Sequence, residues 1–523
     1  MSRGVDLTRR RLLVSGAGFG ALHLVGCASM APAAPAGVTA DPFTLGVASG
    51  EPWADGFVLW TRLVPTPVTD ESGAGGMPPD PVEVGWIVAE DEHLAKVVQQ
   101  GVAVAQPEWG HSVHVEVQGL QPDRAYWYAF RLGSWRSPIG GARTAPVSGA
   151  PMDAFRFAFA SCQNYETGYY AAWRDVVDAD PHLVIFLGDY LYEKSRPPTQ
   201  RLRAHASPDP VSLAEYRRRY EQYRLDDHLQ RAHAHCCWLV TWDDHEVRND
   251  YADLENPEEW PPEAFAVRRA AAYQAWYEHM PVRLRARPVD GHVQLYASYD
   301  FGDLLRVNVL DGRQYRDHHP CTAPGKRGGR VIENCEERLA SSRTLLGTAQ
   351  EDWLAGRLTG SPAVWNVLAQ QYLLAPLDQK PGPGEAFWSD NWDGAPAARH
   401  RLLRTLSDRN VGNPVVIGGD IHSYWANDVL LNGIGSPVVA SEFTGTSISS
   451  PGISYEGIRA MRADNPHVKF ADSRYRGHVL CEVTKGRWRT QFRALDDVMR
   501  RDSASHTLAA FVVESGLPGV QPG

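Results

Sequence analysis

The chain has 523 residues, of which 43% are hydrophobic and 22% are charged, and this balance excludes a largely disordered protein. The length exceeds that of a typical single domain, so two domains and a short leading segment are expected. A formal net charge of −10 argues against a broadly basic surface, and we expect no stable complex with nucleic acid.

Residues 1–40 have the pattern of an export signal followed by a linker. Arg9, Arg10 and Arg11 precede an apolar run that ends near Cys27 and is too short to span a bilayer well. A basic start, a short apolar stretch and small residues around a cleavage position indicate a bacterial signal peptide, and the paired arginines indicate the twin-arginine export machinery. We therefore expect an exported protein of the periplasm or cell envelope.

The end of the apolar run contains a potential lipidation site. Leu24, Val25, Gly26 and Cys27 resemble a bacterial lipobox, in which the cysteine is acylated and becomes the new N-terminus. Simple cleavage within residues 28–36 is the alternative. Acylation of Cys27 would give an otherwise soluble protein a lipid anchor in the membrane.

Two of the remaining cysteines are well placed for a disulfide. An exported protein resides in a compartment where disulfides persist. Cys321 and Cys335 flank a loop rich in glycine and basic residues. They are the pair that we expect to be bonded.

Residues 41–145 are predicted to form an all-β domain. Residues 57–61, 82–88 and 112–117 alternate polar and apolar side chains or run apolar, which is typical of strands. The segment 119–128 resembles the corner of fibronectin-type sandwiches, in which a tyrosine near the start of a strand bonds back to the preceding turn. A small fibronectin-like β-sandwich is expected.

Residues 151–500 are predicted to form an α/β domain. Continuous apolar runs separated by helical patterns are typical of buried strands with helical crossovers. The expected strands are 156–160, 183–187, 304–310, 364–368 and 414–417, and the expected helices lie near 169–179, 212–235, 263–279 and 396–408.

The C-terminal residues 501–523 have the composition of a tail. They end in a segment rich in glycine and proline, and chain ends of this kind are usually loose. A flexible end is expected, and a tail that lies over the entrance of an active site is the alternative.

Polar side chains follow several of the predicted strands directly. This is where ligands gather in α/β sheets. Asp243, Asp244, His245 and Glu246 place three carboxylates and an imidazole in four residues, and a bound cation would relieve the repulsion between them. The other strand ends carry Cys162 and Asn164, Asp189 and Tyr192, Gln370 and Gln371, and Asp420 and His422.

The types of these side chains indicate a mixed metal centre. A thiolate and a phenolate, as from Cys162 and Tyr192, favour a metal such as Fe³⁺, whereas carboxylate and amide oxygens suit hard divalent ions such as Ca²⁺, Mg²⁺ or Mn²⁺. The spacing of Asp189 and Tyr192 lets the carboxylate bridge two cations. Two neighbouring metals can polarise a phosphoryl group and supply hydroxide, which is the chemistry of phosphoester hydrolysis.

Taken together, the motifs resemble those of the PhoD-like alkaline phosphatases and phosphodiesterases, within the wider purple-acid-phosphatase-like metallophosphoesterases. The resemblance covers nearly the whole chain after the export signal. It implies a metallophosphoesterase-type β-sandwich core flanked by helices in residues 151–500. The matching segments follow in family order: 43–52, 58–63, 159–163, 187–193, 242–246, 310–316, 346–354, 392–394, 419–422 and 442–447.

The resemblance implies a centre that binds Fe³⁺ and Ca²⁺. The implied iron ligands are Cys162, Asp189, Tyr192 and His422. The implied ligands of the second metal region are Asp189 as a bridge, Asp244 and Asp420, with Asn164 and Asp243 as reserve ligands. Gln370 or Gln371 would supply a further ligand after the fourth strand, and the doublet leaves the choice open.

Two residues are expected to act on the substrate. His245 would contact the phosphate or protonate the leaving oxygen. Arg313 would clamp the phosphate, because a guanidinium matches two phosphoryl oxygens. A structural ion pair with Asp311 is the alternative for Arg313.

The resemblance implies an exported hydrolase of phosphodiesters, phosphomonoesters or both, acting on small phosphoester substrates. One alternative keeps the fold and makes the protein a phospholipid- or teichoic-acid-directed phosphodiesterase of the envelope, or a nuclease. The other is a non-catalytic binding protein of the envelope with a vestigial metal site.

Overall fold

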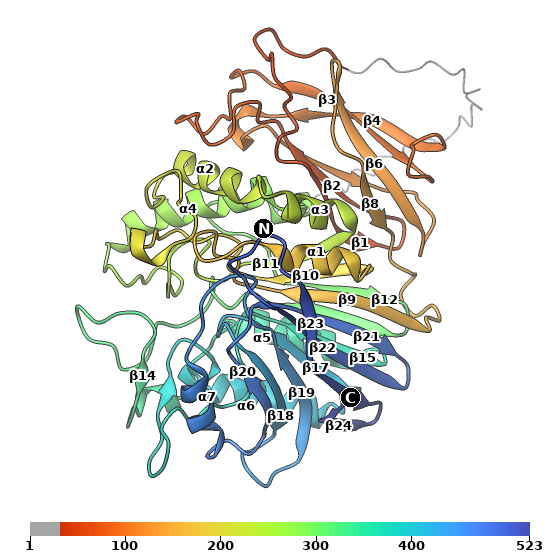
Figure 1. Ribbon diagram of the computed structural model, residues 1–523. Coiled ribbons are helices and arrows are strands. Elements are labelled where there is room, and N and C mark those ends of the chain that lie inside the picture. The colour runs from red at the N-terminus through yellow and green to blue at the C-terminus, as the bar shows by residue number, and fades with distance from the viewer. Residues whose placement is uncertain (1–31) are drawn as a thin grey trace, which may run out of the picture.

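The computed structural model describes residues 32–523, so the arginine motif and Cys27 lie outside the described residues. Two large sheets form the centre of the molecule (Figure 1). Helices α2, α3 and α4 lie on the upper side of the sheets in this view, and α6 and α7 lie on the lower side. The molecule is thus a layered α/β protein, as the sequence predicts.

The larger sheet has ten strands, and its centre is parallel. Strands β9, β10 and β11 run parallel to one another, and β1 runs parallel to β11. In sheet order the strands are β24 (Leu517–Pro522), β23 (Ser505–Glu514), β22 (Arg487–Leu495), β21 (Gly477–Thr484), β9 (Ala154–Ala160), β10 (Leu183–Leu187), β11 (Cys237–Thr241), β1 (Val47–Trp53), β2 (Gly56–Arg62) and β5 (Ser112–Val117).

The second sheet has seven strands, four of which, β13, β15, β17 and β19, are parallel neighbours. In sheet order the strands are β12 (Ala297–Phe301), β13 (Leu305–Val309), β15 (Trp365–Ala369), β17 (Pro414–Gly418), β19 (Val438–Thr444), β18 (Tyr424–Leu430) and β20 (Val468–Asp472).

The helices cover the outer faces of the sheets. Ser212 and Glu215 form a capping box at the start of α2, which satisfies backbone donors that the helix leaves unpaired. The α-helices are α1 (Ala171–Asp178), α2 (Leu213–Arg224), α3 (Asp227–His235), α4 (Pro262–His279), α5 (Thr348–Leu358), α6 (Pro396–Asp408) and α7 (Tyr455–Arg462). Short 3₁₀ helices occur at Pro107–Trp109, Pro198–Gln200, Leu284–Ala286, Glu337–Leu339 and Trp392–Gly394.

Side chains of the central strands alternate between two cores. Leu183, Ile185 and Leu187 of β10 belong to the core between the sheets, together with inner-face residues of the second sheet such as Val367. Val184 and Phe186 of the same strand pack among the helices on the other side. Because both faces are buried, the strand has the continuous apolar run from which it was predicted.

The N-terminal β-region shares a sheet with the α/β part. A five-stranded sheet contains β3 (Val82–Ala89), β4 (Val97–Ala105), β6 (Ala125–Leu132), β7 (Trp135–Arg136) and β8 (Gly140–Arg143). It packs on β1, β2 and β5, which continue the ten-stranded sheet. The predicted tyrosine corner is present, since the backbone N–H of Gln121 donates to the Tyr126 hydroxyl at 3.0 Å. The sandwich forms, but the backbone pairing continues across the boundary expected at residue 145.

The expectation of a flexible C-terminal tail is wrong. Strands β23 and β24 form a hairpin that extends the ten-stranded sheet. Phe511 and Val513 are buried, and the backbone N–H of Val520 donates to Asp428 at 2.8 Å. Gly516, with φ of 81°, lies in the turn, so this glycine supports a hairpin rather than a loose end.

The hairpin is joined to the helical layer through Asp175 of α1. Its carboxylate lies 2.7 Å from Nε2 of His478, accepts from Arg493 at 2.8 Å and accepts from the Ser505 hydroxyl. Burial acts to raise the pKa of Asp175, but the hydrogen bonds and charges of His478 and Arg493 outweigh it and lower the pKa below its ordinary value. The ionised carboxylate therefore stabilises the fold.

Replacing Asp175 with Asn is expected to lower the free energy of unfolding at pH 7 by about 1–2 kcal/mol. A carboxyl group with a lowered folded-state pKa stabilises the fold above its unfolded pKa near ~4, and this contribution declines as pH falls below that value. Urea denaturation at a series of pH values should show the difference from wild type shrinking below about pH 4. Asp178→Asn, at an exposed position of the same helix, is the control, and equal behaviour of the two variants would contradict the role of Asp175.

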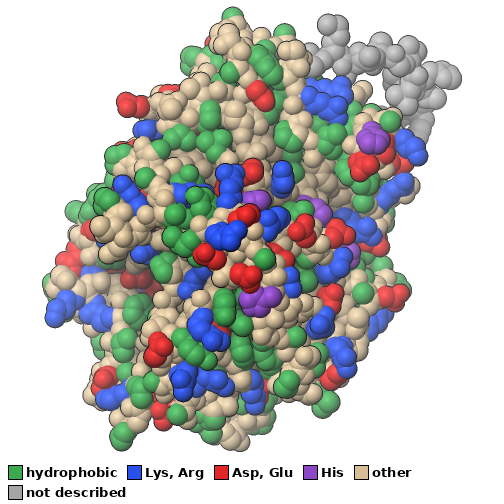
Figure 2. All heavy atoms as spheres, in the orientation of Figure 1, with side chains coloured by type: hydrophobic (Ala, Val, Ile, Leu, Met, Phe, Trp, Pro, Cys, Tyr) green, Lys and Arg blue, Asp and Glu red, His purple; other side chains and the backbone are tan. Residues whose placement is uncertain are grey.

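Two further features complete the fold. Strands β14 (Val331–Ile332) and β16 (Phe387–Trp388) form a small antiparallel pair, and the predicted disulfide between Cys321 and Cys335 is present beside it. Among the described residues, no helix is both long and apolar enough to cross a membrane. On the face shown in Figure 2, acidic and basic side chains are interspersed.

Candidate metal centre

The carboxyl ends of the parallel strands bring the predicted ligands together. Cys162 follows β9, Asp189 follows β10 and Asp244 follows β11, and these three strands are neighbours in the sheet. Asp420 and His422 follow β17 of the second sheet. Because parallel strands end at the same edge, short loops are enough to place side chains from both sheets in one site.

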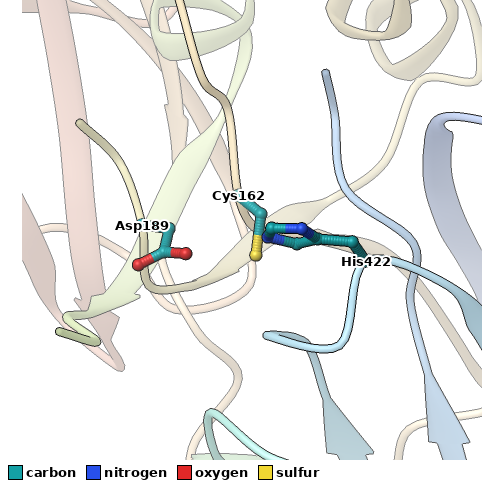
Figure 3. A group of neighbouring side chains, drawn as sticks. All are labelled: Cys162, Asp189 and His422. Atoms are coloured by element: carbon teal, nitrogen blue, oxygen red, sulfur yellow. The ribbon is translucent and has the colours of Figure 1, made fainter. Parts of the chain in front are cut away.

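The four side chains predicted as iron ligands lie in one cluster. Ligand atoms of Cys162, Asp189 and His422 all lie within 4.8 Å of one another (Figure 3). The Tyr192 hydroxyl donates to Asp189 at 2.9 Å and lies 3.0 Å from Nε2 of His422. A thiol, a carboxylate, a phenol and an imidazole thus converge from three separate loops.

A second cluster shares Asp189 with the first. Ligand atoms of Asp189, Asp244 and His245 also lie within 4.8 Å of one another. Asp189 therefore belongs to both sets of ligand atoms. This is the position that the sequence predicts for a bridging ligand. Burial and the negative charges of Asp243 and Asp244 raise the pKa of Asp420 well above its ordinary value, which places Asp420 beside the same carboxylates.

The electrostatics of the site fit a cation. Burial, with the charge of Asp244 adding to it, raises the pKa of Asp189 well above its ordinary value despite the nearby His245. One carboxylate oxygen of Asp243 and one of Asp244 are buried and have no hydrogen-bond partner. Buried, unpaired oxygens of this kind are costly. A bound cation would remove the cost by pairing with the oxygens and stabilising the ionised carboxylates.

His422 has the tautomer and the protonation state that a metal ligand requires. Its Nδ1 lies 2.8 Å from the carbonyl oxygen of Pro451, so Nδ1 carries the proton and Nε2 is left as the ligand atom. Burial lowers the pKa of His422 to about 3, which keeps the imidazole neutral. Neutral imidazole is the ligand form of histidine.

The backbone at the ligand positions is unusual. Cys162, Asp189, Asp420 and His422 have φ values of 61°, 58°, 62° and 54°, a region that costs non-glycine residues about 1–3 kcal/mol. Each lies in a tight turn after a buried strand. Gly188 permits the turn at Asp189, because a Cβ there would lie 2.6 Å from the backbone nitrogen of Asp243. Backbone strain of this kind clusters at functional sites.

Glu246 joins two of the ligand loops. Its carboxylate accepts from the backbone N–H groups of Asp189 at 3.0 Å, Tyr190 at 2.7 Å and Asp243 at 2.9 Å. The sequence places Glu246 in the acidic metal-binding cluster, but the structure uses it to fix the positions of its neighbours.

His245 is held at the edge of the centre by Glu193. The His245 Nδ1 lies 2.7 Å from Glu193, which also accepts from Arg248 and from the backbone of Asn249. Burial acts to lower the pKa of His245, but the charges of Glu193 and Asp189 outweigh it and raise the pKa well above its ordinary value. The raised pKa favours the protonated ring, which can act as a donor. No role for Glu193 was predicted from the sequence, although it lies in the same motif as Asp189.

Arg313 does not have the predicted arrangement. Its side chain is fully buried, and it donates to Asp243 at 2.5 Å and to both oxygens of Asp390 at 2.9 Å. The Arg313 backbone N–H donates to Asp311 at 3.0 Å, but the Arg313 guanidinium does not bond to it. The guanidinium is thus committed to carboxylates, which argues against a phosphate clamp, and its ion-pair partner is not Asp311.

The amide side chains predicted as ligands are engaged elsewhere. Gln371 donates to Thr241, Trp242 and Leu310 at 2.8–2.9 Å and accepts from the backbone of Gly312. Gln370 bonds to Tyr372 and Trp392, and the Asn164 side chain accepts from the backbone of Glu166 at 2.9 Å. These contacts satisfy the backbone of strand ends and turns, so the prediction of Gln371 as a metal ligand is not supported.

Two acidic residues near the centre were missed. Ligand atoms of Asp250 and Asp390 lie within 4.8 Å of each other and of Asp244. Asp390 also pairs with Arg313, Arg316 and His319. Asp390 follows β16, which has only two residues. Such a short strand has no apolar run, so the sequence gives no sign that Asp390 lies at a strand end.

Comparisons with known proteins identify the family of the chain. Residues 157–492 match the family described as PhoD-like phosphatase, and residues 28–146 match its N-terminal domain. The chain is 42% identical over 493 residues to alkaline phosphatase D of Bacillus subtilis (strain 168), covering 92% of this chain and 82% of the relative. A solved structure described as "Structure of PhoD" superposes with a TM-score of 0.88 at 42% identity and covers 92% of each chain. The chain therefore belongs to the PhoD-like phosphatase family and is a phosphoric ester hydrolase.

Proposed function

We propose that this protein hydrolyses phosphodiesters, phosphomonoesters or both at a binuclear centre of Fe³⁺ and Ca²⁺. The observation that carries the proposal is the convergence of Cys162, Asp189, Tyr192 and His422 beside the second group of Asp189, Asp244 and His245. Thiolate and phenolate donors suit Fe³⁺, and the carboxylates of Asp244 and Asp420 suit Ca²⁺. The homology to alkaline phosphatase D over 92% of the chain and the shared fold support the same chemistry.

Bound cations would supply Lewis-acid chemistry that the side chains cannot provide. When bound, a pair of cations polarises a phosphoryl group and lowers the pKa of water. Asp189 would bridge the two positions, and His422 would present Nε2 because Pro451 fixes the proton at Nδ1. No serine nucleophile is needed.

His245 acts as the general acid in this proposal. Its Nε2 is the ring nitrogen opposite the Glu193 contact, and it donates a proton to the leaving oxygen as the ester bond breaks. Glu193 is a positioning residue, because it holds the ring and stabilises its charged form without contacting the substrate. Arg313 takes no part in catalysis and instead keeps Asp243 and Asp390 in place.

The role of His245 predicts a dependence on the leaving group. His245→Gln should reduce turnover of a diester with an alkyl leaving group by about 100-fold or more. The loss should be much smaller for p-nitrophenolate, which leaves without protonation. Steady-state rates with both esters measure the difference, and His400→Gln, at an exposed position, is the control. An equal loss for both leaving groups would contradict the general-acid role.

The proposed location is the periplasm or the cell envelope. Residues 1–40 supply the signal for the twin-arginine machinery, and Cys27 would be lipidated to anchor the protein to the membrane. The disulfide between Cys321 and Cys335 supports an oxidising compartment. Mass spectrometry of the mature N-terminus from native cells would identify the cleavage position and any acyl chains.

A further inference from the structure

A pocket of about 470 Å³ opens beside the metal centre. Its lining includes Asp420 and His422, both from the loop after β17. The volume lies in the range of small-molecule sites, about 300–1,000 Å³, and it exceeds what a phosphoryl group alone would fill. The pocket therefore has room for an organic group attached to a phosphorus atom at the centre.

The rest of the wall is mainly apolar. Among the described residues that line the pocket, none is Lys or Arg, and the other polar side chains are the amides of Gln379 and Asn391. Lys380, the neighbour of Gln379, is paired with Glu333 at 2.6 Å. The apolar lining residues are Val331, Leu373, Trp388, Ile421, Pro451 and Ile453. Such a wall offers no cationic side chain to a second anionic group, whereas burying an apolar group against it makes the free energy of binding more favourable.

The apolar wall is held in place on two sides. Val331 and Trp388 are paired across β14 and β16. Behind them, Ile332, Cys335 and Phe387 form a small apolar cluster, and the disulfide attaches Cys335 to the preceding loop.

Trp388 is also fixed from the metal side. It lies two residues before Asp390, which is buried and paired with Arg313 and Arg316. Its position is thus coupled to the same ion-pair network that holds Asp243. The side of the wall that Trp388 and Val331 form is thus preorganised, so little of the binding free energy is lost in ordering it.

We propose that this pocket binds the ester substituent that stays on the phosphorus, that the substituent is uncharged and apolar, and that Trp388 and Ile453 determine this specificity. The inference rests on the proposed function, because it assumes that the phosphoryl group binds at the metal centre. A phosphodiester with a short alkyl or aryl group therefore fits the wall, whereas a polymer with repeating anionic phosphates does not.

Binding of phosphonates tests the pocket without turnover, because the carbon–phosphorus bond is not hydrolysed. Titration calorimetry on the metal-containing protein as isolated would compare methylphosphonate, hexylphosphonate and 6-phosphonohexanoate, in which a carboxylate replaces the terminal methyl group. Burying a methylene group favours binding by roughly fourfold, so hexylphosphonate should bind at least about tenfold more tightly than methylphosphonate. The carboxylate analogue should lose most of this gain.

Two wall variants and one control test whether the wall causes the preference for the hexyl group. Trp388→Ala and Ile453→Ala should each reduce the hexyl-to-methyl affinity ratio about fivefold while leaving methylphosphonate affinity within about twofold. Ile434→Ala is the matched control, because Ile434 is 71% exposed and does not line the pocket. Equal affinities for hexyl- and methylphosphonate in the wild type, or an unchanged ratio in both wall variants, would overturn the inference.

Turnover of p-nitrophenyl methyl phosphate and p-nitrophenyl hexyl phosphate on the same samples separates this inference from the proposed function. If neither ester is hydrolysed but the affinity preference is present, the proposed function fails and the pocket stands. If both are hydrolysed without any affinity preference, the proposed function stands and the pocket assignment fails.

Discussion

Replacing Asp189 with Asn is expected to remove both metals and to reduce phosphodiester turnover by more than about 100-fold. The residue belongs to both ligand groups and accepts from the Tyr192 hydroxyl. Asparagine tolerates the positive φ of this position but has no charge to offset two cations. Metal analysis and turnover on the same preparation measure the two effects.

The stability of the Asp189→Asn variant provides a second readout. Burial raises the pKa of Asp189, so the metal-free wild type gains nothing from an ionised carboxylate at this position. The metal-free variant should therefore be at least as stable as the metal-free wild type. Asp153→Asn, at an exposed position, is the control, and an Asp189→Asn variant that retains both metals would disprove the bridging assignment.

Replacing Arg313 with Met is expected to lower the free energy of unfolding by about 3–5 kcal/mol. The substitution leaves Asp243 buried without its cation and removes one of the cations that pair with Asp390, and removal of one partner from a buried ion pair is strongly destabilising. Chemical denaturation of the metal-free protein measures the loss. The Arg404→Met variant is the control, because Arg404 and Asp408 form an exposed pair worth less than about 1 kcal/mol.

The Arg313→Met variant also discriminates between the two roles of this residue. A structural role predicts the loss of stability together with a disturbed metal centre. The phosphate-clamp role predicts normal stability and a raised KM for every phosphoester. Normal stability with a raised KM would show that the guanidinium reaches the substrate.

Much of the metal centre could be predicted because its ligands follow apolar strands directly. Cys162, Asp189 and Asp244 end neighbouring parallel strands, and strand order alone makes them converge. The pairing of Cys321 with Cys335 was similarly local, since 14 positions separate the two residues. Short-range patterns of this kind are visible in a single sequence.

The residues that could not be predicted depend on distant partners. Arg313 pairs with Asp390, which lies 77 positions away in the sequence. Neither residue lies in a periodic pattern that would predict the pair. Gln371 follows a strand in the way that a ligand would, but the need to satisfy backbone groups at Trp242 and Leu310 determines its orientation.

The C-terminal hairpin was missed for a related reason. Its glycine and proline residues are typical of a loose end, while its stability comes from pairing with β22 and from burial of Phe511. Tertiary packing of this kind overrides local composition.

The most direct test of the account is metal analysis combined with hydrolysis of bis(p-nitrophenyl) phosphate on one sample of the wild type and one of Cys162→Ala. We predict that the wild type contains iron and calcium, loses activity on chelation and regains it only when both metals return, and that Cys162→Ala loses iron and activity together. A wild type that hydrolyses the ester without bound metal, or a Cys162→Ala variant that keeps both iron and full activity, would contradict the account.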